Sequence, residues 1–194
     1  DLTELSIEEL MSVQVVSPTK QAQRLADTAS AIFVITQDDI RRGGVTNIPD
    51  ALRLAPGVQV ARIDASKWAI TIRGFNGRFA NKLLVLVDGR SIYTPAFAGT
   101  YWEIQDLLLE DIDRIEVIRG PGASLWGANA VNGVINILTK RAADTQGLVS
   151  LTAGNPENTI VGLRYSGSLG DDAHFRVYGK YLHQGGLLDR SEER

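Results

Sequence analysis

Residues 112–121 read IDRIEVIRGP, a run in which isoleucine and valine are interspersed with charged residues. β-Branched residues in such a run are typical of a strand. Gly120, Pro121 and Gly122 follow and end it, because proline lacks the N–H group of a strand ladder and glycine adopts turn conformations. The stretch therefore predicts a strand over residues 112–118 that is stopped by a tight turn.

Short strands and short helices alternate on both sides of this strand. Strand patterns lie at residues 31–35, 58–62, 69–73 and 83–87. Helices are predicted to begin at Thr36 and end at residues 41–44, to begin at Thr46 and bury Ala51, Leu52 and Leu54, and to span Trp102 to Leu109. This alternation predicts a small α+β domain rather than a helix bundle or a sandwich.

After Lys140 only strand patterns remain. Residues 149–153, 161–165 and 175–181 alternate with period two, and turn residues stand between them. They predict an antiparallel meander with one apolar and one polar face. The pattern alone leaves two interpretations open: the first strands of a membrane-spanning barrel, or a soluble hairpin sheet.

Composition and motifs exclude several classes of function. The chain carries 20 Lys and Arg against 23 Asp and Glu, a net charge of −3, which argues against nucleic-acid binding. Cysteine is absent, and the two histidines, His174 and His183, have no companions at metal-ligand spacing. The Gly120-Pro121-Gly122 turn lacks the remaining glycine of a nucleotide fingerprint, and no serine stands in a Gly-x-Ser-x-Gly motif. No catalytic residue, metal site or cofactor is therefore predicted.

Two arginines remain, Arg73 and Arg119, each placed between an apolar strand and a glycine. They are either solvated at the surface, or each guanidinium is held beside its turn to contact carboxylates of another element. Spacing alone does not decide between the two.

The motifs over residues 31–140 together resemble the plug domain of TonB-dependent outer-membrane receptors. They are FVIT at 33–36, DALR at 50–53, PGV at 56–58, IRG at 72–74, LVLVDG at 84–89, IDRIEVIRGP at 112–121, LWGANA at 125–130 and GVINILTK at 133–140. The resemblance implies an α+β plug, with a mixed β-sheet and short helices, followed by the first antiparallel strands of a large transmembrane β-barrel. It implies three parts: a flexible N-terminal arm over 1–30, the plug over 31–140, and the start of the barrel over 141–194.

The resemblance also gives expectations for the barrel strands and for the two arginines. The strands are expected at 147–154, 159–167 and 174–183. Val161, Leu163, Tyr165, Phe175, Val177 and Tyr181 are expected to face lipid, and Arg164, Arg176 and Lys180 the lumen. Arg73 and Arg119 match plug arginines that pair with glutamates of the barrel wall and lock the plug.

In this family an N-terminal TonB box adds as a strand to TonB, the periplasmic energy-coupling protein. The candidate here is the segment Ser12, Val13, Gln14, Val15, Val16 and Ser17. It departs from the usual acidic-Thr-hydrophobic-Val-Thr pattern, so a plain linker is the other interpretation. The resemblance places the arm in the periplasm and the plug inside its own barrel in the bacterial outer membrane.

The resemblance implies that ligand contacts come from apical plug loops together with the lumen and outer loops of the barrel. The candidates are Lys67, Trp68, Arg90, Tyr93, Phe97, Tyr101 and Trp102; their aromatic rings suit an apolar or planar ligand, although Trp68, Tyr93 and Trp102 could instead cover the core. Residues 76–82 are a further polar loop.

The implied function is active transport, not enzymatic catalysis. By default the resemblance implies a metal chelate as substrate, first of all a ferric siderophore. Cobalamin, a sugar oligomer or another metal complex would fit the plug equally well. The alternative is a free-standing periplasmic or extracellular binding module without a barrel, and a nucleotide-binding enzyme ranks third.

Overall fold

The computed structural model describes residues 14–16, 22–24, 31–64, 66–74, 76–120, 126–127, 129–154, 158–170 and 172–184. The chain forms two compact units, Asp1–Ala61 with Trp68–Thr139, and Arg62–Lys67 with Lys140–Arg194. Within the described ranges, no helix is both long enough and apolar enough to cross a membrane.

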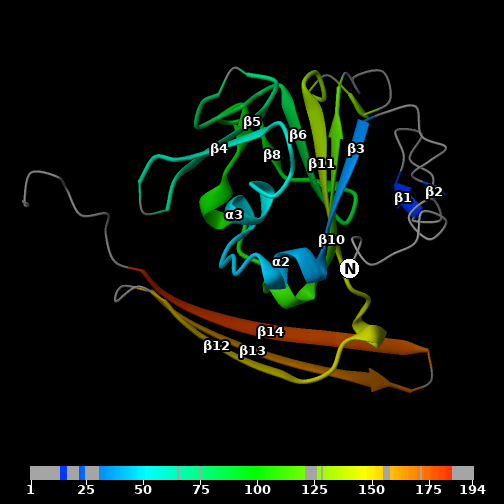
Figure 1. The fold of residues 1–194 in the computed structure, drawn as a ribbon. Helices are drawn as coiled ribbons and strands as arrows, with labels where there is room; N and C mark the ends of the chain where they lie inside the picture. The colour runs from blue at the N-terminus through cyan, green and yellow to red at the C-terminus, as the bar shows by residue number, and fades with distance from the viewer. Residues whose placement is uncertain are drawn as a thin grey trace, which may run out of the picture. The chain divides into compact units, whose positions relative to one another are not determined.

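A five-stranded mixed sheet is the centre of the first unit (Figure 1). In spatial order its strands are β3 (Ala31–Thr36), β10 (Ile112–Arg119), β11 (Gly133–Thr139), β6 (Leu83–Val87) and β7 (Arg90–Ser91). Only the β11–β6 pair is parallel, and the other pairs are antiparallel. The predicted strand at 112–118 is confirmed, and the same sheet contains two other predicted strands, 31–35 and 83–87.

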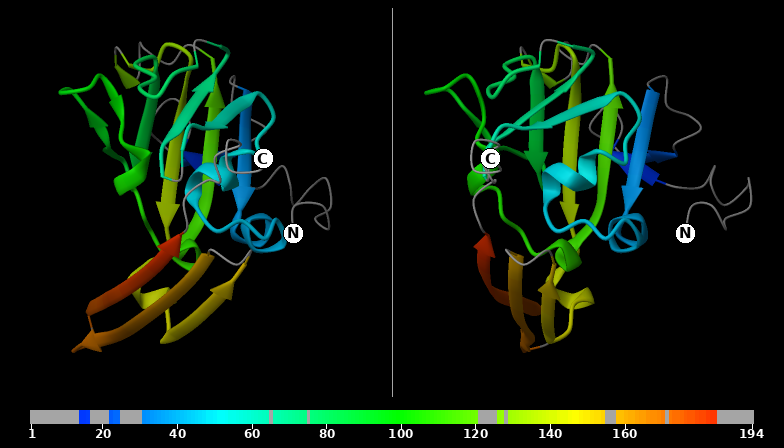
Figure 2. Two further views of the ribbon diagram at one scale, coloured as in Figure 1. Left: turned by 90° about the vertical axis from the view of Figure 1, so that its left-hand side faces the viewer. Right: turned by 60° about the vertical axis from the view of Figure 1, so that its left-hand side comes forward.

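One face of this sheet carries the main core. In one transverse row, Ile115 of β10 stands between Ile35 of β3 and Ile137 of β11, and all three are buried. Two helices pack on this face and bury Ile40, Ile48, Ala51 and Leu52 against it (Figures 1 and 2). Burial of these apolar side chains holds the helices on the sheet.

The first helix begins at its predicted cap, Thr36, whereas the second begins after Asn47 and not at Thr46. α2 (Gln37–Arg42) has a capping box, in which the Asp39 N–H donates to Thr36 Oγ1 at 3.2 Å and the Thr36 N–H donates to Asp39 Oδ2 at 2.8 Å. α3 (Ile48–Leu52) begins after Asn47, whose Oδ1 accepts from the Asp50 N–H at 2.8 Å.

Two expectations for the helical segments were wrong. Leu54 is 37% exposed, because α3 ends at Leu52 and Leu54 lies beyond its last turn. The helix expected over Trp102 to Leu109 is replaced by two 3₁₀ turns, η2 (Trp102–Ile104) and η3 (Leu109–Asp111). Trp102 and Leu108 are both buried. In an α-helix, two residues six positions apart point in directions that differ by about 240° around the helix axis. One helix could not turn both toward the core, so the segment between the turns is not helical.

Two further two-stranded sheets complete the first unit. β4 (Val58–Arg62) pairs with β5 (Trp68–Ile72), and β8 (Tyr93–Thr94) pairs with β9 (Gly99–Thr100). β5 is buried on both sides, including Thr71. Thr71 tolerates burial because its hydroxyl donates to the Gly74 carbonyl at 2.8 Å.

The second unit contains the antiparallel meander β12 (Leu148–Ala153), β13 (Asn158–Leu169) and β14 (Ala173–Gln184), preceded by the 3₁₀ turn η4 (Ala142–Asp144). Val149 pairs with Leu163, and Leu163 with Gly179.

Near the N-terminus, β1 (Gln14–Val16) pairs antiparallel with β2 (Ala22–Arg24). The fold class is thus confirmed: a mixed sheet with short helices, then antiparallel strands.

Gly133 tests how tightly the core closes at the start of β11. A Cβ atom there would lie 2.5 Å from the Ile118 carbonyl oxygen and 3.0 Å from Ile72 Cδ1. We expect Gly133→Ala to lower the free energy of unfolding by about 1–3 kcal/mol in urea denaturation, because backbone and a packed side chain must shift. Gly77→Ala is the matched control, since nothing lies within 4 Å of its Cβ position. Equal stability of both variants would contradict this packing.

Candidate functional site

Arg73 and Arg119 leave the fold at the same end of the domain. Arg119 is the last residue of β10 and pairs with Gly133, and Gly133 is in turn packed against Ile72, the neighbour of Arg73. The two arginines, which are 46 positions apart in the sequence, therefore belong to one end of the core.

The Arg119 side chain is only partly satisfied. Its Nη1 donates to the Pro56 carbonyl at 3.4 Å, and its Cδ lies 3.7 Å from the Cβ position of Gly57. Its Nε is buried and has no hydrogen-bond partner in the described part of the chain. A buried donor without a partner is uncommon, so this guanidinium has capacity for a further acceptor.

Arg73 is held in a strained backbone conformation. Its φ is +63°, and Gly74 follows with a φ of +88°. A non-glycine residue in this region costs free energy and is found more often at functional positions. Arg73 is exposed, and among the described residues it has no ion-pair or hydrogen-bond partner. The turn thus presents a free guanidinium.

The loop between β4 and β5 is organised by Asp64. Asp64 Oδ1 accepts from the N–H groups of Ser66 at 3.0 Å and Lys67 at 2.9 Å, and Oδ2 pairs with the Lys67 ammonium. The hydrogen bond from the Lys67 side chain, followed by that from the Ser66 N–H, lowers the pKa of Asp64 to about 2. Lys67, a ligand-contact candidate, is therefore already paired.

The remaining ligand-contact candidates fall into buried and accessible groups. Trp68 and Trp102 are buried in the main core. Covering the core was the alternative to ligand contact that the sequence left open for these two residues. Tyr93 is half-buried, whereas Arg90 is exposed and Phe97 is 51% exposed. The accessible candidates are therefore Arg90, Phe97 and the half-buried Tyr93 and Tyr101.

Phe97 and Tyr101 belong to a three-ring cluster with Phe79. The ring centroids are 5.5 Å apart for Phe79–Phe97, 5.2 Å for Phe79–Tyr101 and 4.9 Å for Phe97–Tyr101. The Arg78 guanidinium lies 5.1 Å from the Phe79 centroid and 2.7 Å from a carboxylate oxygen of Glu103. We call these four residues, Arg78, Phe79, Phe97 and Tyr101, the aromatic cluster.

Sequence reasoning missed Arg78 and Phe79. They belong to the polar loop 76–82, and the signal available was an arginine beside an aromatic residue in that loop. Gly99 allows the approach: a Cβ there would lie 2.8 Å from Phe79 Cα.

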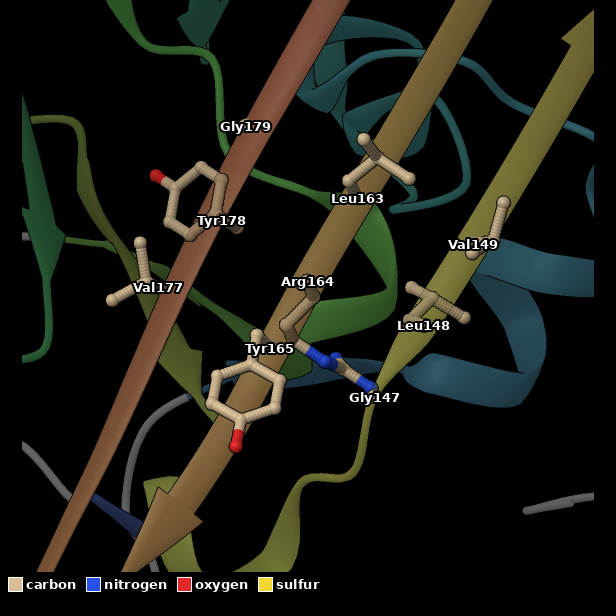
Figure 3. Close-up of a pocket in the computed structure, with 9 residues that line it drawn as sticks. All are labelled: Gly147, Leu148, Val149, Leu163, Arg164, Tyr165, Val177, Tyr178 and Gly179. Atoms are coloured by element: carbon tan, nitrogen blue, oxygen red, sulfur yellow. The ribbon is translucent and has the colours of Figure 1, made fainter.

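The meander has one apolar face that is open. The register places Val149 of β12, Leu163 and Tyr165 of β13 and Val177 of β14 on this face, and their exposed fractions run from 54% to 77%. They line a shallow hollow of about 630 Å³, to which all three strands contribute (Figure 3). On the other face, Arg164 Nε donates to the Gln146 carbonyl at 2.8 Å and Arg176 Nη1 to the Lys140 carbonyl at 2.9 Å.

Of the predicted TonB box, the described part is Gln14, Val15 and Val16, which form β1; Ser12, Val13 and Ser17 lie outside the described residues. Its extended conformation is the one that strand addition requires. Within the described ranges, no three His, Cys, Asp or Glu residues lie close enough together to hold a metal ion.

The plug motifs correspond to a match over more than half of the chain. Residues 24–134 match the family model described as the TonB-dependent Receptor Plug Domain. The chain therefore belongs to the plug-domain family of TonB-dependent receptors. This family is one of outer-membrane receptors and transporters, not of enzymes.

Particular relatives lie within this family. The chain is 34% identical over 144 residues to the vitamin B12 transporter BtuB of Vibrio vulnificus (strain CMCP6), a match that covers 73% of this chain and 23% of that protein.

Solved structures have a similar fold. The pyoverdine outer membrane receptor FpvA from Pseudomonas aeruginosa PAO1, bound to pyoverdine, has a TM-score of 0.71 at 25% identity over 88% of this chain and 24% of that one. The siderophore receptor PirA from Acinetobacter baumannii has a TM-score of 0.56 at 31% identity over 79% and 24%. The chain thus spans about a quarter of the length of these relatives.

Asp64 supplies a test of the β4–β5 loop. We expect Asp64→Asn to speed hydrogen exchange at the Ser66 and Lys67 amides, because a neutral amide is a weaker acceptor than a carboxylate. In the unsubstituted chain the same amides should stay protected above pH 4 and lose protection as the pH falls toward 2, since the folded-state pKa lies below the ordinary value of 3.8.

Ser66→Ala serves as the control, because it leaves the backbone N–H in place. Protection that is unchanged in Asp64→Asn would show that the carboxylate does not organise the loop.

Proposed function

We propose that this chain is the gating part of a TonB-dependent transporter in the bacterial outer membrane. Substrate binds from outside, and energy coupled from the periplasm displaces the plug from its barrel. The family match over residues 24–134 carries this proposal. Because the chain spans about a quarter of its relatives, transport itself is inferred for the longer receptor.

In this proposal, Arg73 and Arg119 lock the plug. Both arginines belong to one end of the core, and within the described residues both have donors left over for acceptors elsewhere. A carboxylate of the barrel wall would satisfy the buried Nε of Arg119 and neutralise its charge. The strained turn at Arg73 supports the same role, because it sets the direction in which the Arg73 side chain leaves the backbone.

The proposed substrate is a metal chelate, a class that includes both ferric siderophores and vitamin B12. The aromatic cluster supports a planar or apolar ligand surface, with Phe97 as its most accessible ring. Arg90 and the half-buried Tyr93 remain proposed contacts. Lys67, Trp68 and Trp102 are weaker candidates, because Lys67 is paired and the two tryptophans are buried.

The meander is proposed as the first three barrel strands, with the boundary between plug and barrel near Lys140. Its open apolar face would contact lipid through Val161, Leu163, Tyr165, Phe175, Val177 and Tyr181. Arg164, Arg176 and Lys180 occupy the alternate positions, which would line the lumen. This alternation is the pattern that a transmembrane strand requires.

Strand addition at the N-terminal arm tests the transport proposal. We expect Val15→Pro to weaken binding of the periplasmic domain of TonB by about tenfold or more in calorimetric titration, because proline removes a ladder donor. Val15→Thr keeps the N–H group and a β-branched side chain, so its affinity should match that of the unsubstituted chain. Equal binding by Val15→Pro would place the TonB box elsewhere, and no binding by any form would favour the free-standing binding module.

The lipid face can be tested separately. We expect the chain to bind detergent micelles or to self-associate, and the double variant Val149→Asp, Leu163→Asp to stay monomeric in light scattering, because charge on a lipid face opposes its burial. The pair Ser150→Asp, Ser166→Asp places the same charges on the opposite face and should keep detergent binding. A monodisperse monomer before any substitution would contradict barrel strands.

A further inference from the structure

The second face of the five-stranded sheet differs from the core face. Its central row runs from Val34 of β3 through Glu116 of β10 and Asn136 of β11 to Leu86 of β6. Two polar residues thus stand in the middle of a sheet face, and both are buried, with exposed fractions of 0% for Glu116 and 2% for Asn136. Buried polar residues of this kind need partners.

Glu116 has its partners, but Asn136 is only half satisfied. Arg114 Nε donates to Glu116 Oε1 at 2.9 Å, and Asn136 Nδ2 donates to Glu116 Oε2 at 3.4 Å. The carboxylate fixes the amide orientation, because only the NH₂ group can face an acceptor. Asn136 Oδ1 is then left without a hydrogen-bond partner among the described residues.

A cavity of about 640 Å³ lies at Asn136. The residues that line it include Leu84, Leu86 and Leu138, together with Trp126 and Asp88. This combination of apolar walls and a few polar groups, in this size range, is typical of small-ligand sites. The unpaired amide oxygen is the group that such a ligand would meet.

The charges of the cavity select the ligand. Among the described residues that line it, Asp88 is the one charged side chain, and no lysine or arginine is present. Each Asp88 carboxylate oxygen accepts one hydrogen bond from Thr139, at 2.8 Å from the N–H and 2.9 Å from the hydroxyl, which leaves further lone pairs. The cavity therefore offers acceptors and negative charge, so it favours a cationic donor over an anion.

We propose that this cavity binds an alkyl-guanidinium group. The head group donates to Asn136 Oδ1 and to the Asp88 carboxylate, and the alkyl stem covers the leucines of the wall. Asp88 and Asn136 line the same cavity, and a guanidinium group has several N–H donors with which one ligand can address both residues. Trp126 adds an aromatic ring of the kind that attracts such cations.

Titration of the 194-residue chain with n-butylguanidinium, followed by NMR at the Asn136 side-chain amide and the Trp126 indole, tests the proposal. We expect saturable shifts at both groups, weaker ones with n-butylammonium, and none with n-butyrate. Asn136→Leu should lower the affinity by about tenfold or more, because it removes the acceptor for a charged donor. Asn81→Ala, an exposed asparagine outside the cavity, should leave it unchanged.

Asp88→Asn provides a second variant if Asn136→Leu does not fold. An asparagine can still accept from the Thr139 N–H, and its NH₂ group can donate to the Thr139 hydroxyl in place of the second bond. The charge is lost, so affinity for n-butylguanidinium should fall by about three- to tenfold. Butyrate binding as tightly as butylguanidinium, or affinity that is unchanged in a folded variant, would overturn the proposal, as would the absence of any saturable shift.

An alkyl-guanidinium group could come from an arginine side chain of a polypeptide or from a small free cation. Titration with a tripeptide distinguishes these two sources. Saturable binding of acetyl-Ala-Arg-Ala-amide would support an arginine side chain of a polypeptide as occupant. Binding of n-butylguanidinium without the tripeptide would support a small free cation. The outcome is independent of transport, because neither probe involves TonB or a chelate.

Discussion

The fold depends on β10 being paired on both sides. From Arg114 to Arg119, each residue of β10 lies opposite one residue of β3 and one residue of β11. A shift by one residue would exchange Ile115 and Val117 for Glu116, and would bury a carboxylate in the main core. The alternation in residues 112–119 thus specifies register for three strands at once.

Strand register and close packing together determine the structure at the end of the domain where Arg73 and Arg119 lie. Gly133 is the position where β11, Ile118 and Ile72 approach so closely that a side chain has no room. This approach brings the ends of β10 and β5 together, and with them Arg119 and Arg73. The positions proposed to lock the plug are therefore set by backbone contacts rather than by the arginine side chains themselves.

The sequence predicts the strands and helix starts of this domain, because local signals determine them. The Thr36 and Asn47 caps and the Asp88-Gly89 turn act within three residues of their position. The prediction of a helix over residues 102–109 was wrong, because the conformation of this segment depends on the burial of Trp102 and Leu108 in the core. No local sequence pattern indicates that burial. The same holds for the aromatic cluster and for the cavity beside Asn136, since both join residues from distant segments. The ion pair between Lys67 and Asp64 could have been predicted from the sequence, since the two residues are only three positions apart.

The position of β3 has a mechanical consequence. β3 is the edge strand of its sheet and has a single ladder, with β10, whereas β10 and β11 each have two. The chain reaches β3 from its N-terminal side at Ala31, and Ala31 lies opposite Arg119. Tension that travels along the chain from the N-terminus therefore loads this ladder first at the Ala31–Arg119 pair. Peeled from that end, the ladder would yield one pair at a time, at a much lower force than simultaneous shear of all six pairs, and the rest of the sheet would keep its hydrogen bonds.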